Sequence, residues 1–228
     1  MKRRALLTIL LSVCCLSQPL SAADSAANQA SVNAGAVGNP YQQWELGPNR
    51  AKSFFPIAVW LQNPANAPRY QAAGINLYIG LDHGPTEAQL ATLKQHNMPV
   101  MCEQNQIGLA HIDDPFIVGW CQGDEPDIAH PFKKFWGGDV ERIKAAWPGL
   151  FDELGPSKPY KGYGPPLPPA WIIRDYAAIK AKDPKRPVYL CLSTDVAYDK
   201  WPGRGERSGK TDDLPEYIKG CDITSFDI

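Results

Sequence analysis

One acidic segment combines residue types that could transfer a proton. Residues 123–127 read Gly-Asp-Glu-Pro-Asp, and they follow an apolar run from Phe116 to Trp120. Cleavage of a glycosidic bond needs one carboxylic acid held protonated, which gives its proton to the leaving oxygen, and a second carboxylate as nucleophile or base. Burial and an acidic neighbour both raise the pKa of a carboxyl group, and Asp124 is such a neighbour of Glu125. Glu125 is therefore the candidate acid/base, although the segment read alone also fits an acidic turn around Pro126.

The other apolar runs also end in residues that could contact a ligand. Their end residues are Trp60, Gln62, Asp82, His83, Glu103, Gln104, Asn105, Gln122, Ser193, Thr194 and Asp195. A sugar-binding cleft uses aromatic faces against the C–H faces of the ring, and amides and carboxylates for its hydroxyls. The predicted substrate-binding residues are Trp60, Gln62, Glu103, Gln104, Trp120 and Asp124. Glu103 is either a second functional carboxylate or a partner that tunes Glu125.

Apolar runs that alternate with helical stretches must position these residues. The runs are Phe55 to Leu61, Ile75 to Leu81, Pro99 to Cys102, Phe116 to Trp120, Val188 to Leu192 and Ile223 to Ile228. Their nearly continuous apolar character is typical of strands covered on both faces. Thr86 and Gln89 predict a helix start with a capping box, and a second helix is predicted from about Ala170 to Lys182. The alternation predicts an α/β fold with a parallel sheet.

The acidic segment and its strand resemble a known signature. Residues 117–127 are similar to the fourth strand of clan A glycoside hydrolases, where a strand runs into Asn-Glu-Pro or Asp-Glu-Pro and the Glu is the acid/base. Residues 54–60, 73–76 and 221–228 also resemble bacterial barrels of this kind. The resemblance covers about residues 54–228 and implies a (β/α)8 TIM barrel that hydrolyses O-glycosidic bonds of a poly- or oligosaccharide, with Glu125 as acid/base. Asp124 stands where the family usually has Asn, which puts the usual contact to the sugar 2-hydroxyl in doubt.

The number of strands predicts only part of such a barrel. An eight-fold barrel usually needs about 250 residues, and six strands fit into residues 51–228. The resemblance implies a nucleophilic Glu on the seventh strand, which this chain does not reach. We therefore expect about six βα units and an inactive fragment. An open doubly wound sheet is disfavoured, because no Gly-rich phosphate turn follows the first strand.

The N-terminus has the three parts of a signal peptide. Basic residues at 2–4, an apolar stretch at 5–16 and the small residues Ser21-Ala22-Ala23 predict cleavage after residue 23. The apolar stretch is too short for stable membrane insertion, which needs about 20 residues. Residues 24–50 are predicted to be a flexible leader, because the part before Asn39 has hardly a large apolar side chain. The protein is expected to be secreted or periplasmic; a lipoprotein with Cys14 modified is less favoured.

Net charge and cysteine spacing restrict the classes of partner that we expect for this protein. Without the signal peptide the chain has 20 basic and 24 acidic residues, a formal charge of −4, and no basic run that would bind nucleic acid. A carbohydrate substrate is the expected partner, no cofactor is expected, and the oligomeric state is open. No cysteine spacing suggests zinc. Cys102, Cys121, Cys191 and Cys221 are expected to be free buried thiols, with one disulfide as the alternative.

Two other functions stay open. A metal-dependent barrel could use His83, Glu103, Asp124 and Glu125 as ligands. A non-catalytic carbohydrate-binding barrel could use Trp60, Trp120 and Gln104. The remaining predictions place His96, His111 and His130 at the surface or in loops, His83 in a loop or against substrate, and Arg204 and Arg207 in solvent.

Overall fold

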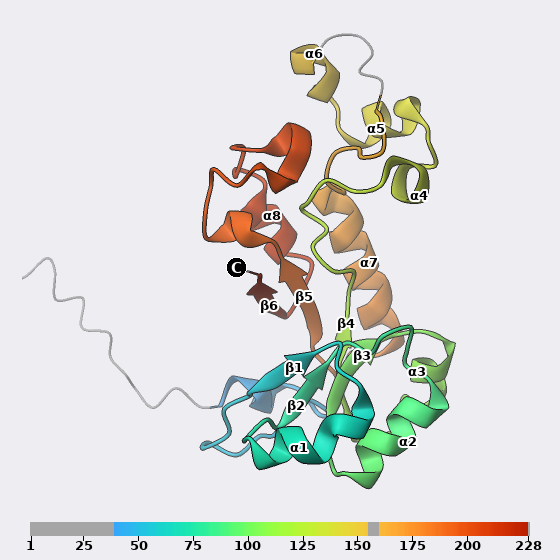
Figure 1. The fold of residues 1–228 in the computed structure, drawn as a ribbon, viewed down its shortest axis with the longest axis vertical. Coiled ribbons are helices and arrows are strands. Elements are labelled where there is room, and N and C mark those ends of the chain that lie inside the picture. Colours follow the sequence, from blue (N-terminus) through green and yellow to red (C-terminus); the bar gives the residue numbers. More distant parts are fainter. Residues whose placement is uncertain (1–38, 155–159, 228) are drawn as a thin grey trace, which may run out of the picture. The chain divides into compact units, whose positions relative to one another are not determined.

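Six parallel strands form one sheet in sequence order (Figure 1). The computed structural model describes residues 39–154 and 160–227. The predicted signal peptide and residues 24–38 of the predicted leader lie outside the described residues. The strands are β1 (Ala58–Trp60), β2 (Leu77–Ile79), β3 (Val100–Glu103), β4 (Ile117–Cys121), β5 (Val188–Leu192) and β6 (Ile223–Phe226). Each predicted apolar run overlaps one of these strands, with β3 and β4 each ending one residue beyond the predicted run, so the predicted α/β class is confirmed.

Helices connect the strands. They are α1 (Ala67–Ala72), α2 (Glu87–Gln95), α3 (Gln106–Ala110), α4 (Phe132–Trp136), α5 (Val140–Ala146), α6 (Leu150–Leu154), α7 (Pro169–Lys182) and α8 (Leu214–Ile218). Short 3-10 helices are η1 (Pro40–Gln43), η2 (Pro64–Asn66), η3 (Thr194–Val196) and η4 (Pro202–Arg207). The capping box predicted at Thr86 and Gln89 is present at the start of α2, and α7 matches the second predicted helix to one residue.

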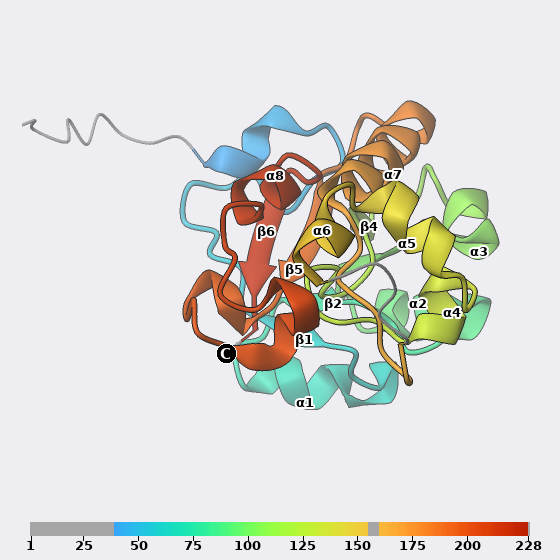
Figure 2. The ribbon, with the colours of Figure 1, turned by 90° about the horizontal axis from the view of Figure 1, so that it is seen from above.

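The sheet curls into half of a TIM barrel. Trp60 of β1 and Tyr189 of β5 meet across its inner face, with ring centroids 6.0 Å apart. Among the described strands β1 and β6 are the edges, and they do not pair with each other. Figure 2 looks onto this curved arrangement from above, with α1, α2, α3 and α7 around the strands. The fold class expected from the sequence, a partial TIM barrel of six βα units, is confirmed.

Two hydrophobic layers explain why the strand sequences are apolar on both faces. Inward side chains such as Leu77, Met101 and Tyr189 form one cluster on the concave face. Tyr78, Val100 and other outward side chains pack against the helices in a second cluster. Because successive strand residues point to opposite faces, a strand buried on both sides must be apolar at nearly every position.

The segment before β1 packs against the barrel. Residues 40–43 form η1, Trp44 is buried, and the Leu46 N–H donates to Lys185 O at 3.1 Å. The predicted domain boundary at residue 50 stays a prediction.

A buried arginine joins the loops at the N-terminal ends of β4 and β5. Arg186 is fully buried, and its guanidinium donates to the carbonyls of Ile117 (2.6 Å), Ile112 (2.6 Å) and Asp114 (2.8 Å). It also pairs with Asp183 at 2.7 Å. This network ties the β3–β4 connection to the start of β5. Within the described part of the chain, no helix is both long enough and apolar enough to cross a membrane.

Candidate active site

The loop after β4 holds Glu125 in an unusual backbone conformation. Glu125 has φ of 41°, in the left-handed region that side chains other than glycine rarely adopt. Its N–H donates to Cys191 O at 3.0 Å, and its carbonyl accepts from Ile128 N at 3.2 Å. His130 Nε2 also donates to this carbonyl at 3.2 Å. Such a conformation costs on the order of 1–3 kcal/mol and persists only where the surroundings enforce it, often at functional sites.

Asp127 anchors this loop to the end of β5. Its side chain is fully buried, and its carboxylate accepts from Ser193 N at 3.0 Å and from Ser193 Oγ at 2.6 Å. Its backbone carbonyl accepts from Arg204 Nε at 3.1 Å. Asp127, two residues after Glu125, is therefore fixed through its carboxylate by Ser193 and through its carbonyl by Arg204.

Arg204 is buried, which corrects the expectation that it is solvated. Its guanidinium donates to Asp213 at 2.8 Å and lies 3.4 Å from Asp195 Oδ2. Asp195 is buried as well, and neither carboxylate oxygen has a hydrogen-bond partner among the described residues. Burial raises the pKa of Asp195, and the charge of Arg204 only partly offsets this effect. Arg207 also pairs with Asp213, at 3.1 Å, so it too is more than a solvated side chain.

The charges of three nearby carboxylates act on Glu125 at the C-terminal ends of β4 and β6. Burial raises the pKa of Glu125, and the charges of Asp124, Asp227 and Asp127 raise it further. Burial, followed by the charge of Asp227, also raises the pKa of Asp124. A half-buried carboxyl surrounded by acids holds its proton at higher pH than a solvated one, which is the property that a general acid needs.

Three of the predicted substrate-binding residues line one cavity of about 890 Å³, which we name the α7 groove. They are Glu103, Gln104 and Asp124, and the groove also contains residues of α4, α5 and α7. Gly123, Asp124 and Pro126 line it, so it reaches the residues on both sides of Glu125. The Gln104 amide donates to Ile179 O of α7 at 3.2 Å, and its buried Oε1 has no partner among the described residues.

Trp60 and Gln62 lie elsewhere. Trp60 lines a separate hollow of about 270 Å³ on the inner face, together with Tyr189, Cys191 and Asp227. Gln62 is exposed, and its Oε1 accepts from the Tyr70 hydroxyl of α1 at 2.7 Å. Each cavity is lined by one carboxylate whose charge raises the pKa of Glu125. This carboxylate is Asp227 in the inner hollow and Asp124 in the α7 groove.

Trp120 faces away from any cavity described above. Its indole is fully buried in the outer cluster, and Nε1 donates to Asp183 at 2.8 Å. Because Trp120 and Cys121 are neighbours on one strand, they point to opposite faces, and the outward position carries the indole into the core. We leave Trp120 out of the proposed site.

Two residues at this site were not selected from the sequence. Asp227 follows β6 as Glu103 ends β3, so the strand-end criterion could have found it. His130 lies in a loop, as predicted, but it is buried, with its ring 4.3 Å from Phe135. Burial lowers the pKa of His130, so the ring is favoured as a neutral donor to Glu125 O. No pattern in the sequence indicates this contact, because it depends on how the loop after β4 turns back.

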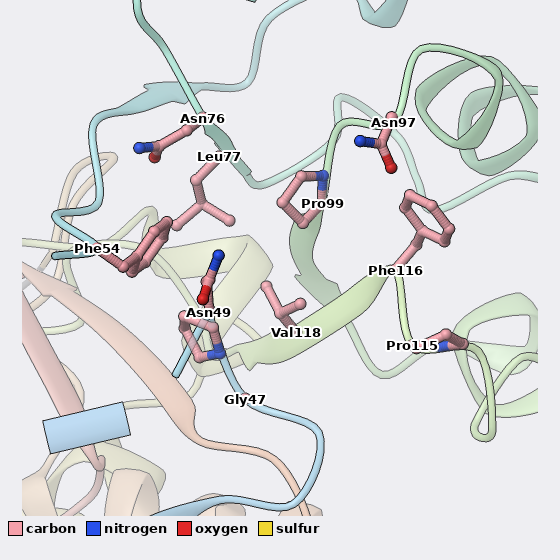
Figure 3. A pocket seen from close by; sticks show the side chains of 11 residues that line it. Gly47, Asn49, Phe54, Asn76, Leu77, Asn97, Pro99, Pro115, Phe116 and Val118 are labelled. Carbon is pink, nitrogen blue, oxygen red and sulfur yellow. The ribbon is translucent and has the colours of Figure 1, made fainter. Parts of the chain in front are cut away.

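The opposite end of the sheet has a different kind of cavity. Figure 3 shows a hollow of about 510 Å³ between residues 47–54 and the starts of β2, β3 and β4. Its eleven lining residues include Asn49, Asn76, Asn97, Phe54 and Phe116, and none has an ionisable side chain. The acid/base candidates therefore gather at the C-terminal ends of the strands, where barrel enzymes carry their active sites.

The described cysteines are unpaired, and the possible metal ligands are not clustered. Cys102, Cys121, Cys191 and Cys221 are free thiols, as expected, and Cys221 is only partly buried. Within residues 39–154 and 160–227, no three His, Cys, Asp or Glu side chains are grouped as a metal site would require.

Comparisons with known proteins found structural likeness only. No protein-family model and no curated protein matches the sequence.

The structure is similar to parts of glycoside hydrolase chains. A β-galactosidase from the Antarctic haloarchaeon Halorubrum lacusprofundi is 12% identical, with a TM-score of 0.42, and the match covers 76% of this chain and 39% of that one. A β-glucuronidase from Bacteroides uniformis is 13% identical, with a TM-score of 0.43 and coverage of 81% and 22%. An endo-1,4-β-mannanase from Eisenia fetida is 16% identical, with a TM-score of 0.35 and coverage of 72% and 59%. The chain thus spans less than two thirds of each of these proteins.

Proposed function

We propose that this chain carries the acid/base half of a glycoside hydrolase active site, with Glu125 as the proton donor. The observation that carries the proposal is the clamped position of Glu125, in a left-handed backbone conformation at the C-terminal ends of the strands. Hydrogen bonds from Ser193 and Arg204 to Asp127 hold the loop against the end of β5 and against η4. A strained residue that the surroundings fix so firmly is favoured at a catalytic position.

The chemistry follows from the charges around Glu125. Burial, followed by the charges of Asp124 and Asp227, raises the pKa of its carboxyl, so a larger fraction is protonated near neutral pH than for a solvated Glu. The protonated carboxyl would donate to the oxygen of the leaving sugar as the glycosidic bond breaks. The hydrogen bonds at Glu125 and Asp127 fix the position of the loop that carries the acid. A fixed position is needed because a general acid acts only within hydrogen-bond reach of the departing oxygen.

The test compares leaving groups. Glu125→Gln is nearly isosteric and keeps the loop, but it cannot donate an acidic proton. In a protein that also supplies the second carboxylate, we expect hydrolysis of a natural oligosaccharide to slow by about 10²–10⁴-fold, and hydrolysis of an aryl glycoside with a good leaving group to slow far less.

Glu103→Gln is the matched control, because Glu103 also ends a strand but is not among the charges that act on Glu125. If Glu125→Gln stayed within a few-fold of the unmodified protein while Glu103→Gln abolished hydrolysis, the acid would have to be moved to β3. If oligosaccharide binding were retained and no hydrolysis occurred even with the second carboxylate present, the non-catalytic carbohydrate-binding alternative would be supported instead.

A further inference from the structure

The α7 groove has an outer part that the proton-transfer proposal does not use. In Figure 1, α4 and α5 lie near the start of α7, and α3 lies near its end. The connection between β3 and β4 contains only the five-residue α3, whereas α7 has 14 residues. Residues from all four helices or the loops beside them line this one cavity of about 890 Å³.

Three cations in the groove have no acidic partner. Lys134, Arg142 and Lys182 are exposed, and none forms an ion pair with a carboxylate of the described residues. The acids that also line the groove are Glu103 and Asp124 at the strand ends and Asp175 on α7. The Asp175 carboxylate is already occupied, because Arg174 donates to it at 2.8 and 2.9 Å. Away from the strand ends, the uncompensated charge of the groove is therefore positive.

An aromatic face accompanies these cations. The Arg142 guanidinium lies 5.1 Å from the ring centroid of Trp171, which also lines the groove and packs on Trp136. This contact fixes a guanidinium beside an indole, a pair that can hold an anionic group and the apolar face of a ring together.

The spacing of the cations indicates an extended ligand. Trp171 and Lys182 lie near opposite ends of α7, about 16 Å apart along the helix axis at about 1.5 Å per residue. One small anion could not reach Arg142 and Lys182 at once. A chain with repeated anionic groups could pair with both and continue past Asp124 toward Glu125.

We propose that the α7 groove binds an acidic oligosaccharide, a chain of uronate or sulfated sugars, and leads it to Glu125. The sugar part of this assignment rests on the proposed glycosidase function. The anionic part rests on Lys134, Arg142 and Lys182.

The test measures binding to the intact chain by calorimetry at low salt. The probes are an oligogalacturonate, a neutral cello-oligosaccharide of the same length and a polyglutamate of similar charge. We expect the oligogalacturonate to bind at least roughly tenfold more tightly than either of the others, and its affinity to fall as salt is added.

A triple variant isolates the cations. Lys134→Gln, Arg142→Gln and Lys182→Gln together should weaken oligogalacturonate binding by roughly tenfold or more, since each exposed charge contact contributes modestly. The matched control is the triple variant Lys52→Gln, Lys133→Gln and Lys200→Gln, which removes the same charge from exposed residues outside the groove. It should bind within about twofold of the unmodified chain.

Several outcomes would overturn the assignment: equal binding of the neutral oligosaccharide, equal binding of polyglutamate, or equal loss in the two triple variants. Glu125→Gln separates this inference from the proposed function, because the substitution leaves all three cations in place. Hydrolysis that is indifferent to Glu125 with intact oligogalacturonate binding would refute only the proposed function. Hydrolysis that requires Glu125 without such binding would refute only the acidic ligand.

Discussion

Two buried arginines hold opposite ends of the same sheet, and their surroundings differ. At the N-terminal ends of the strands, Arg186 makes short hydrogen bonds to three carbonyls and pairs with Asp183. At the C-terminal ends, Arg204 holds Asp127 O and Asp213, but the neighbouring Asp195 carboxylate accepts no hydrogen bond from the described residues. The first network is satisfied, whereas the second leaves a buried charge poorly compensated.

The pKa directions express the same difference. Burial opposes ionisation of Asp183, but hydrogen bonds from Arg186, the Lys185 N–H and Trp120 outweigh it and lower the pKa. At the other end, burial prevails and raises the pKa of Asp195, Asp127 and Glu125. The N-terminal end is therefore arranged for stability, whereas the C-terminal end retains strain and unfavourable charge beside Glu125. Barrel enzymes commonly divide the two faces in this way.

The largest expected effect is on the free energy of unfolding, at the N-terminal ends of the strands, where Arg186 makes its hydrogen bonds. Arg186→Met should lower the free energy of unfolding by about 3–5 kcal/mol, because it leaves the Asp183 charge buried without its cation. Urea unfolding followed by circular dichroism measures this loss. Lys185→Met, at an exposed neighbour, is the control and should change stability by no more than about 0.5 kcal/mol. A loss below about 1 kcal/mol for Arg186→Met would remove the contrast between the two ends.

At the C-terminal ends of the strands, removal of a buried charge is expected to raise the free energy of unfolding by a smaller amount. Because the pKa of Asp195 is raised in the folded protein, its ionised form destabilises the fold as pH rises above the usual aspartate value of about 3.9. Asp195→Asn should therefore stabilise the protein at neutral pH by about 1 kcal/mol, and the gain should vanish in acid, where the group is protonated in both states.

Asp183→Asn is the matched variant for this test. Because the pKa of Asp183 is lowered in the folded protein, its stabilisation is present at neutral pH and is lost as pH falls through that lowered value. Thermal unfolding of both variants as a function of pH should give opposite signs at neutral pH. Destabilisation by Asp195→Asn would show that its pairing with Arg204 outweighs its burial.

The smallest effect concerns the proton donor itself. Asp124 is the largest charge contribution to the raised pKa of Glu125, so Asp124→Asn should lower that pKa. In a protein that also supplies the second carboxylate, the alkaline limb of the kcat/KM profile should then move to lower pH, because Glu125 loses its proton earlier. Glu103→Gln should leave the limb in place. Equal movement in the two variants would show that general surface charge, rather than the Asp124 carboxylate, tunes Glu125.

Sequence patterns predicted the strands because a buried strand leaves a local signature. Val188–Leu192 is apolar at every position, and β5 begins and ends there. The capping box at Thr86 is similarly local, since its two hydrogen bonds lie within one helical turn. By contrast, α4, α5 and α6 were not predicted, because short helices without a sustained apolar period depend on packing with distant segments.

The alternation of strands and helices could be predicted from the sequence, and with it the placement of Glu125 beyond the end of β4. Both follow from hydrophobic periodicity and chain connectivity, which act over a few residues. Which strand-end residues share a cavity was set by the three-dimensional fold: it turned Trp120 into the core, separated Trp60 from Glu103, and brought Asp227 toward Glu125. It also buried Arg204, because the partners of that guanidinium lie as far as 77 positions away along the chain. Contacts of that range depend on the curl of the sheet and the return path of each loop, which no local pattern encodes.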